Sequence, residues 1–177
     1  MNSAYAINKE RLIYTFLELI KINSPSLHEG EIGELLADKL RKAGCSITLQ
    51  DYGASFNLLA FKEGPKRYVP SLILSAHMDT IEPSEGIMFQ VEDDVIRTTG
   101  PTILGADDKG ALAQIIEALY VLQEQGIPHG DIEIIFSSAE EIGLLGARNI
   151  DFAEIRGRHA IVLDSSGSVG SLVVAAP

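Results

Sequence analysis

The 177-residue sequence is poor in cysteine and in basic residues, and it has no long apolar run. Its single cysteine, Cys45, excludes an intrachain disulfide and a metal site built from several cysteines. Its 14 basic and 25 acidic residues give a net charge of −11. This balance argues against nucleic acid or an anionic membrane as the main partner, because both need clustered Lys and Arg.

Targeting signals are also missing from the sequence. No apolar run approaches the roughly 20 residues that span a bilayer. The N-terminus lacks the basic region and apolar stretch of a signal peptide. We therefore expect a cytoplasmic protein that contacts neither nucleic acid nor a membrane.

What is present is the composition of one globular domain, which we expect to occupy residues 1–177. Hydrophobic residues make up 46% of the chain and charged residues 22%, and there is no repeat, low-complexity stretch or linker. Helices are expected around residues 13–20, 32–42 and 112–119, strands at 46–50, 57–61, 71–75, 132–136, 160–163 and 171–175, and a hairpin at 86–100 with its turn at 92–94. Alternating helices and strands, some strands apolar on both faces, indicate an α/β sheet covered on both sides.

Acidic and histidine residues cluster where hydrophobic runs end. The four clusters are Ser75-Ala-His77-Met-Asp79-Thr80, Gly105-Ala-Asp107-Asp108-Lys109-Gly110, Ala139-Glu140-Glu141-Ile-Gly143 and Leu163-Asp164-Ser-Ser-Gly167. Ligands of open α/β sheets collect at the carboxyl ends of the strands. A mixed nitrogen and oxygen set of this kind suits zinc, manganese or cobalt, so the clusters predict a cation site.

Each cluster taken alone also has a structural explanation. His77 can be a hydrogen-bonded histidine at a strand end, Asp107–Asp108 and Glu140–Glu141 can satisfy helix N-termini, and Asp164 can form an Asx-turn. Together they favour hydrolytic chemistry, since one carboxylate of a pair can bind a metal while its neighbour takes a proton from water. The remaining histidines are expected to be structural or solvated: His28, His129 and His159.

These motifs resemble those of the peptidase T-like branch of the dinuclear zinc peptidases and deacylases, relatives of glutamate carboxypeptidase, aminoacylase and succinyl-diaminopimelate desuccinylase. The matching segments come in the family's order and at similar spacing: His77-Met-Asp-Thr80, Thr102-Ile-Leu-Gly-Ala-Asp-Asp-Lys-Gly110, Glu140-Glu-Ile-Gly143 and Val162-Leu-Asp-Ser-Ser-Gly167. The resemblance implies a three-layer α/β catalytic domain with a mixed, mostly parallel central sheet.

The resemblance also implies a set of metal ligands. His77 and Asp164 would be terminal ligands of one zinc ion, and Glu141 would bind a second. Asp107 would bridge the two ions and precede a cis peptide bond to Asp108. Manganese or cobalt could replace zinc.

Two further roles follow from the resemblance. Glu140 would be the general base that activates the bridging water, and Asp79 would orient His77. The substrate would be a small peptide.

The sequence departs from the family pattern at its C-terminus. In the family, an inserted lid domain and a later catalytic segment supply the last histidine ligand and the substrate contacts, and Pro177 falls about where the lid is expected to begin. We therefore expect the N-terminal part of a catalytic domain, truncated before the lid. His77, Asp107 and Asp164 complete the first metal position, whereas Asp107 and Glu141 leave the second incomplete.

This incomplete set has three expected consequences. The chain would bind one metal tightly and the second weakly, it would show little or no peptidase activity, and it would expose an apolar face or sheet edge that promotes self-association, with a homodimer as one outcome.

For the complete enzyme, the resemblance implies metal-dependent hydrolysis of an amide bond in a small peptide, with release of the N-terminal residue from a tripeptide. A carboxypeptidase or an N-acyl amino acid deacylase would share the metal core and differ in its substrate contacts. A non-catalytic metal- or peptide-binding module is a separate hypothesis, although such a module has no use for the base Glu140. For the 177 residues by themselves, a fragment without an independent role is the favoured interpretation.

Overall fold

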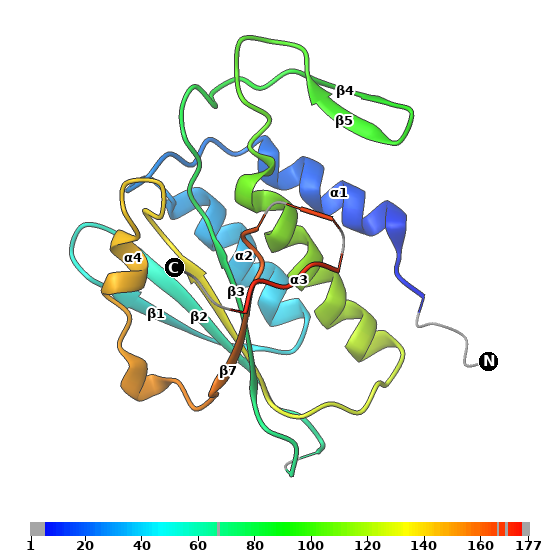
Figure 1. Cartoon of the computed structure of the whole chain (residues 1–177), viewed down its shortest axis with the longest axis vertical. Helices are drawn as coiled ribbons and strands as arrows, with labels where there is room; N and C mark the ends of the chain where they lie inside the picture. Colours follow the sequence, from blue (N-terminus) through cyan, green and yellow to red (C-terminus); the bar gives the residue numbers. More distant parts are fainter. Residues whose placement is uncertain (1–5, 67, 166, 169, 175–177) are drawn as a thin grey trace.

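The computed structural model describes residues 6–66, 68–165, 167–168 and 170–174, which form a central sheet with helices packed on it. Among these residues the main sheet has five strands, in the order β1 (Ser46–Asp51), β2 (Phe56–Lys62), β6 (Ile132–Ser137), β3 (Leu72–His77) and β7 (His159–Val162) (Figure 1). β2 pairs antiparallel with β1 and β6, whereas β3 pairs parallel with β6 and β7. All strands of this sheet except β2 therefore run in one direction, which confirms the mixed, mostly parallel sheet.

The helices α1 (Lys9–Ile20), α2 (Gly30–Lys42) and α3 (Ala106–Glu124) build the hydrophobic core against one face of this sheet. Leu58 of β2 and Phe136 of β6 are paired in register and fully buried, as is Ile134 two residues earlier on the same face of β6. The apolar stripes of the helices pack on these side chains. The periodicity of the sequence had predicted all three helices.

Local sequence sets the ends of the first two helices. The side chain of Asn8 accepts a hydrogen bond from the main-chain N–H of Arg11 and caps α1. The last turn of α2 carries Arg41 and Lys42, and the chain leaves it through Gly44, whose φ of 80° suits glycine. The predicted end of this helix at residue 42 is confirmed.

The segment between β6 and β7 lies against the other face of the sheet. It contains the short helix α4 (Leu145–Arg148) and the 3₁₀ turn η1 (Phe152–Glu154). The side-chain amide of Asn57 on β2 donates to the carbonyl of Gly146 at 2.9 Å, and the guanidinium of Arg156 lies 4.9 Å from the centre of the Phe61 ring. Both faces of the sheet are therefore in contact with other parts of the chain.

A separate hairpin stands apart from the main sheet. It consists of β4 (Phe89–Glu92) and β5 (Val95–Thr98), at the top of Figure 1. Asp93 and Asp94 form its two-residue turn with positive φ angles, the conformation that tight hairpin turns favour. The predicted hairpin and its turn are confirmed.

Two sequence-based expectations differ from the structure. The strand expected at 171–175 is wrong for residues 171–174, which pair with no strand in the described chain; Ala175 lies outside the described residues. An apolar run forms a strand only where another strand pairs with its backbone N–H and C=O groups. Residues 171–174 have no such partner strand among the described residues, and the side chains of Leu172, Val173 and Val174 are exposed. The helix whose N-terminus Glu140–Glu141 was expected to satisfy begins only at Leu145, after a turn.

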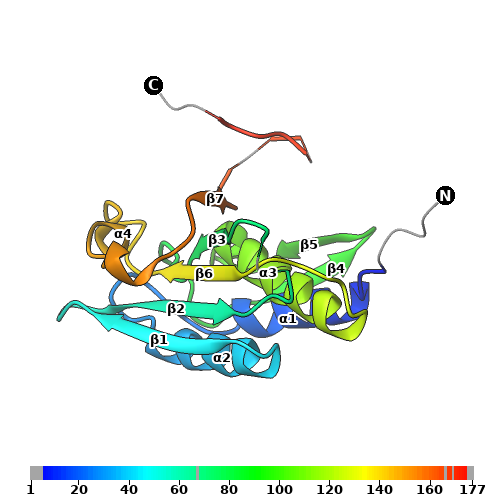
Figure 2. The same cartoon turned by 90° about the horizontal axis from the view of Figure 1, so that it is seen from below.

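An apolar groove opens between the β3–β7 edge of the sheet and the helices α1 and α3. Its volume is about 1000 Å³, and its walls include Leu74, Ile115 and Ile161. β7 is an edge strand in the described part of the chain, and its Val162 is 62% exposed. The expected exposed apolar face and sheet edge are therefore present. Figure 2 shows β7 at one border of the fan of strands and β1 at the other.

None of the helices in the described residues combines the length and the apolar character needed to cross a membrane.

Candidate metal centre

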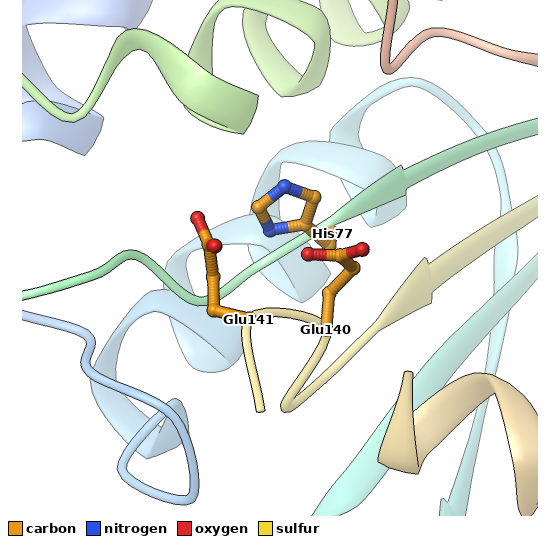
Figure 3. A group of neighbouring side chains, drawn as sticks. All are labelled: His77, Glu140 and Glu141. Carbon is orange, nitrogen blue, oxygen red and sulfur yellow. The ribbon is translucent and has the colours of Figure 1, made fainter. Parts of the chain in front are cut away.

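The predicted site begins where β3 and β6 end side by side. His77 is the last residue of β3, which extends two residues beyond the predicted run, and it is paired in register with Ser137, the last residue of β6. The loop that follows β6 then carries Glu140 and Glu141. Figure 3 shows both carboxylates reaching from this loop towards the imidazole of His77. Parallel pairing of the two strands therefore joins motifs that lie about sixty residues apart in the sequence.

Two groups of potential metal ligands share His77. One contains His77, Glu140 and Glu141, and the other contains His77, Asp107 and Asp164. In each group, one ligand atom from every residue lies within 4.8 Å of the others. The structure thus brings all the predicted ligands to one place. Asp107 and Glu141, the two expected ligands of a second ion, belong to different groups.

Asp79 is fully buried, and its carboxylate binds both the loop of Glu140 and Glu141 and the loop of Ser26. Its Oδ1 accepts a hydrogen bond from the main-chain N–H of Glu140 at 2.9 Å, and its Oδ2 accepts from the N–H of Glu141 at 3.1 Å and from the hydroxyl of Ser26 at 2.6 Å. The carboxylate therefore fixes the acidic loop. Ser26 was not anticipated from the sequence, because nothing in its loop marks it as a partner of Asp79.

The imidazole of His77 is held mainly by the main chain of Asp79. Its Nδ1 lies 2.9 Å from the carbonyl oxygen of Asp79 and 3.5 Å from the Oδ1 atom. A carbonyl can only accept, so Nδ1 carries the proton and donates. Nε2 lies 3.1 Å from Oδ1 of Asp107 and donates its own proton to that carboxylate in the metal-free protein. Once this proton leaves, the lone pair of Nε2 points into the site, as a metal ligand requires.

Asp107 and Asp108 take opposite positions at the start of α3. The cis peptide bond implied by the resemblance joins them. The Asp107 side chain is 74% exposed and faces the site, whereas Asp108 is buried and its Oδ2 accepts from the main-chain N–H of His77 at 3.2 Å. Asp108 therefore supports the end of β3, a role that the acidic pair in the sequence did not reveal.

The electrostatics of the site are those of crowded carboxylates. Burial raises the pKa of Glu140 and of Glu141, and the charges of the other site carboxylates raise both further against the attraction of His77. Burial also raises the pKa of Asp108 to about 7. Burial lowers the pKa of His77, but its hydrogen bond with Asp79 and the charge of Asp108 outweigh this effect and raise it to about 9.

This donor set fits a divalent cation. One imidazole and several carboxylates are the ligands that zinc, manganese and cobalt accept. A cation among them would remove the mutual repulsion that raises the pKa of the two glutamates, and it would displace the proton from Nε2 of His77.

Comparison with known proteins places the chain among peptidases. Residues 57–171 match the sequence model of Peptidase family M28. The uncharacterized protein YqjE of Bacillus subtilis is 41% identical over 97% of this chain, which covers 47% of that protein. Two solved structures share the fold. Aminopeptidase PepT from Bacillus cereus has a TM-score of 0.89 and is 40% identical, and the match covers 93% of this chain and 45% of that protein. A tripeptidase from Staphylococcus aureus has a TM-score of 0.86 and is 36% identical, and the match covers 91% of this chain and 44% of that protein.

The chain spans less than half the length of each of these three proteins. The matched residues include all four acidic and histidine motifs, and the predicted resemblance to the peptidase T-like enzymes is confirmed. On this match and on the shared fold, the chain belongs to peptidase family M28.

Proposed function

We propose that this chain carries the metal-binding core of a peptidase that hydrolyses small peptides, with zinc as the first choice of metal and manganese or cobalt as substitutes. The observation that carries the proposal is the convergence of His77 with the two pairs of acidic ligands at one end of the sheet. The relatives named aminopeptidase PepT and tripeptidase support it, because they share the fold at 36–40% identity.

One ligand group gives the proposed ligands of the first ion, and the resemblance to the peptidase T-like enzymes gives those of the second. His77, Asp107 and Asp164 would hold one ion, and Glu141 with Asp107 would hold a second. When bound, such ions polarise a scissile carbonyl and lower the pKa of a water molecule between them. The proposal of two ions rests on the resemblance and on the exposed position of Asp107, whose carboxylate faces the site.

Glu140 is the proposed general base. It is half-buried, so its carboxylate remains accessible to a water molecule in the site. Burial is the main cause of its raised pKa and persists when a cation is bound, and it moves the proton affinity of the carboxylate towards the neutral range, where a general base is most effective. The hydrogen bond from its main-chain N–H to Asp79 holds it in place.

The 177 residues by themselves offer few ligands for the second ion. His28, His129 and His159 belong to neither ligand group of the described residues, so no second imidazole reaches Glu141. We therefore propose one tight metal site and one weak site, with little turnover by this chain alone. Self-association, including a homodimer, is proposed from the exposed edge of β7 and the adjacent groove.

Titration of zinc into the metal-free protein tests this proposal, with His77→Ala and Glu141→Ala as variants. One tight site that disappears in His77→Ala and changes little in Glu141→Ala is the expected result. Two tight sites in the wild type would contradict the assignment of a weak second site. Absence of binding would contradict the metal centre.

The finer proposal for the substrate is release of the N-terminal residue from a tripeptide. A carboxypeptidase or an N-acyl amino acid deacylase is the alternative with the same metal core. Zinc-loaded protein at high concentration, wild type beside Glu140→Gln, is offered free tripeptides and N-acetyl amino acids. Slow tripeptide hydrolysis that Glu140→Gln abolishes would support the aminopeptidase proposal, whereas preferential cleavage of the N-acetyl compounds would support the alternative.

A further inference from the structure

Glu29 is a buried carboxylate that belongs to neither ligand group. It immediately precedes α2 and is 1% exposed. Its Oε1 accepts hydrogen bonds from the main-chain N–H of Leu27 at 2.9 Å and of Ala139 at 2.8 Å, and its Oε2 accepts from the hydroxyl of Ser55 at 2.7 Å. A single side chain thus ties together three loops that are distant in the sequence.

The two backbone donors of Glu29 share an unusual conformation. Leu27 has a φ of 71° and Ala139 a φ of 50°, in the left-handed region that residues with a Cβ rarely adopt. Such a conformation persists where the surrounding contacts hold it, and one oxygen of Glu29 contacts both N–H groups.

Ala139 directly precedes the acidic pair of the site. Its N–H is held by Glu29, and the next two N–H groups, of Glu140 and Glu141, are held by Asp79. Two buried carboxylates therefore fix three successive main-chain donors. The direction of the chain at Ala139 determines where the two following side chains point.

We propose that Glu29 is a positioning residue of the metal centre. It sets the main-chain conformation at Ala139 and thereby aims the carboxylates of Glu140 and Glu141 at His77. It contacts neither of these carboxylates and acts through the loop. The proposal rests on the proposed function in one respect, namely that Glu141 helps to hold the weaker cation.

The same molecule offers a matched control in Glu133. This glutamate is also buried, and it accepts hydrogen bonds from the hydroxyl of Ser71 and from the main-chain N–H groups of Arg156 and Gly157. It lies on β6 four residues before Ser137, which places it about 13 Å from the site end of the strand. Glu29 and Glu133 therefore have the same kind of partners, and only Glu29 adjoins the site.

The experiment compares wild type, Glu29→Ala, Glu29→Gln and Glu133→Ala by cobalt titration, followed in the visible absorption spectrum. Glu29→Ala is expected to weaken the second, weaker cobalt site at least tenfold and to change its absorption band, with the tight site within about threefold of wild type. Glu29→Gln should restore most of the affinity, because its amide oxygen can still accept from both N–H groups while Ser55 turns to accept from the amide. Glu133→Ala should leave both sites unchanged.

Two results of this titration would overturn the proposal. One is an unchanged weaker site in Glu29→Ala. The other is an equal loss of affinity at the weaker site in Glu133→Ala. That result would mean that the loss of any buried carboxylate weakens cobalt binding by lowering the stability of the whole protein.

Amide hydrogen exchange of the metal-free proteins provides a second measurement that does not depend on cations or on the stability of the Ala variants. In Glu29→Gln, the amides of Ala139, Glu140 and Glu141 should exchange at least threefold faster than in wild type, because a neutral acceptor holds the loop less firmly. In Glu133→Gln, the faster amides should be those of residues 156 and 157. Unchanged exchange at 139–141 would refute the hold of Glu29 on the loop. Faster exchange in Glu29→Gln, together with a wild type that binds no metal, would refute the metal centre and leave the hold of Glu29 on the loop standing.

Discussion

Replacement of Asp79 by asparagine tests whether a buried carboxylate holds the acidic loop. In wild type, the charged side chain accepts from two main-chain N–H groups and from Ser26. Asparagine keeps one oxygen, so one N–H of the pair at Glu140 and Glu141 would face the NH₂ group of the amide. An unsatisfied buried N–H costs about 1–3 kcal/mol, and the remaining N–H would exchange a charged acceptor for a neutral one at a cost of about 1 kcal/mol. We expect Asp79→Asn to lower the free energy of unfolding by about 2–4 kcal/mol.

The pH dependence of this loss has a definite sign. Burial alone would raise the pKa of Asp79, but hydrogen bonds with His77, Ser26 and the two loop N–H groups outweigh it and lower the pKa. A native pKa below the unfolded value of about 3.9 means that the unfolded chain takes up the proton first, so the stabilisation is complete above about pH 4 and is lost as the pH falls through the native pKa. The difference between wild type and Asp79→Asn should therefore shrink in acid, below about pH 4. It should also shrink as the pH rises through about 9, because Asp79 helps to raise the pKa of His77 to about 9 and this contribution is lost when His77 is deprotonated.

Urea unfolding of the metal-free proteins measures both effects. Asp131→Asn is the control, because Asp131 is half-buried and its Oδ1 accepts from one main-chain N–H, that of Gly64, at 2.9 Å. This control should lose about 1 kcal/mol or less. A loss below about 0.5 kcal/mol in Asp79→Asn, within the range of ordinary surface substitutions, would refute the argument. So would a difference from wild type that grows as the pH falls below about 4.

Three further experiments test other parts of the structure. Gly146→Ala should lower the free energy of unfolding, measured in urea, by more than about 2 kcal/mol, since its Cβ would lie 2.2 Å from the carbonyl oxygen of Ser138. Gly110→Ala lies inside α3, and apart from the neighbouring backbone of its own helix no atom lies within 4 Å of the new Cβ, so this substitution should be neutral or stabilising. Burial raises the pKa of Cys45 to about 11. Near pH 8 only about one thiol in a thousand is then ionised, so an aromatic disulfide reagent should react at a normal rate only after unfolding. Val162→Lys on the exposed edge of β7 should reduce concentration-dependent self-association in light scattering, and an unchanged mass distribution would exclude this edge as the contact.

Local structure was predictable because short-range patterns determine it. The helical spacing of apolar residues located α1, α2 and α3, and Gly44 marked the end of α2. The position of the site was also predictable, since motifs that follow parallel strands must meet at the same end of a sheet. His77 and the pair Glu140–Glu141 meet for this reason.

Long-range pairing was not predictable from the same patterns. β6 lies between β2 and β3 in the sheet, although about fifty-five residues separate it from β3 in the sequence, and no periodicity encodes that order. The apolar run at 171–174 has the composition of a strand, yet it pairs with no strand in the described chain. Apolar composition indicates that a segment could be buried in a sheet, but it does not specify which strand would pair with it. Glu29 reads as an acidic residue ahead of a helix, and only the structure shows that Ala139 donates to it.

The acidic residues around the site divide into two classes by their partners. The buried carboxylates of Glu29, Asp79 and Asp108 accept hydrogen bonds from main-chain N–H groups, so the fold itself supplies their partners. The acidic members of the ligand groups are half-buried or exposed and gather around His77, where their charges repel one another. Backbone donors cannot move to another acceptor without unfolding a loop, whereas a cation can enter and leave. Loss of a buried carboxylate should therefore lower stability first, and loss of a ligand carboxylate should weaken cation binding first.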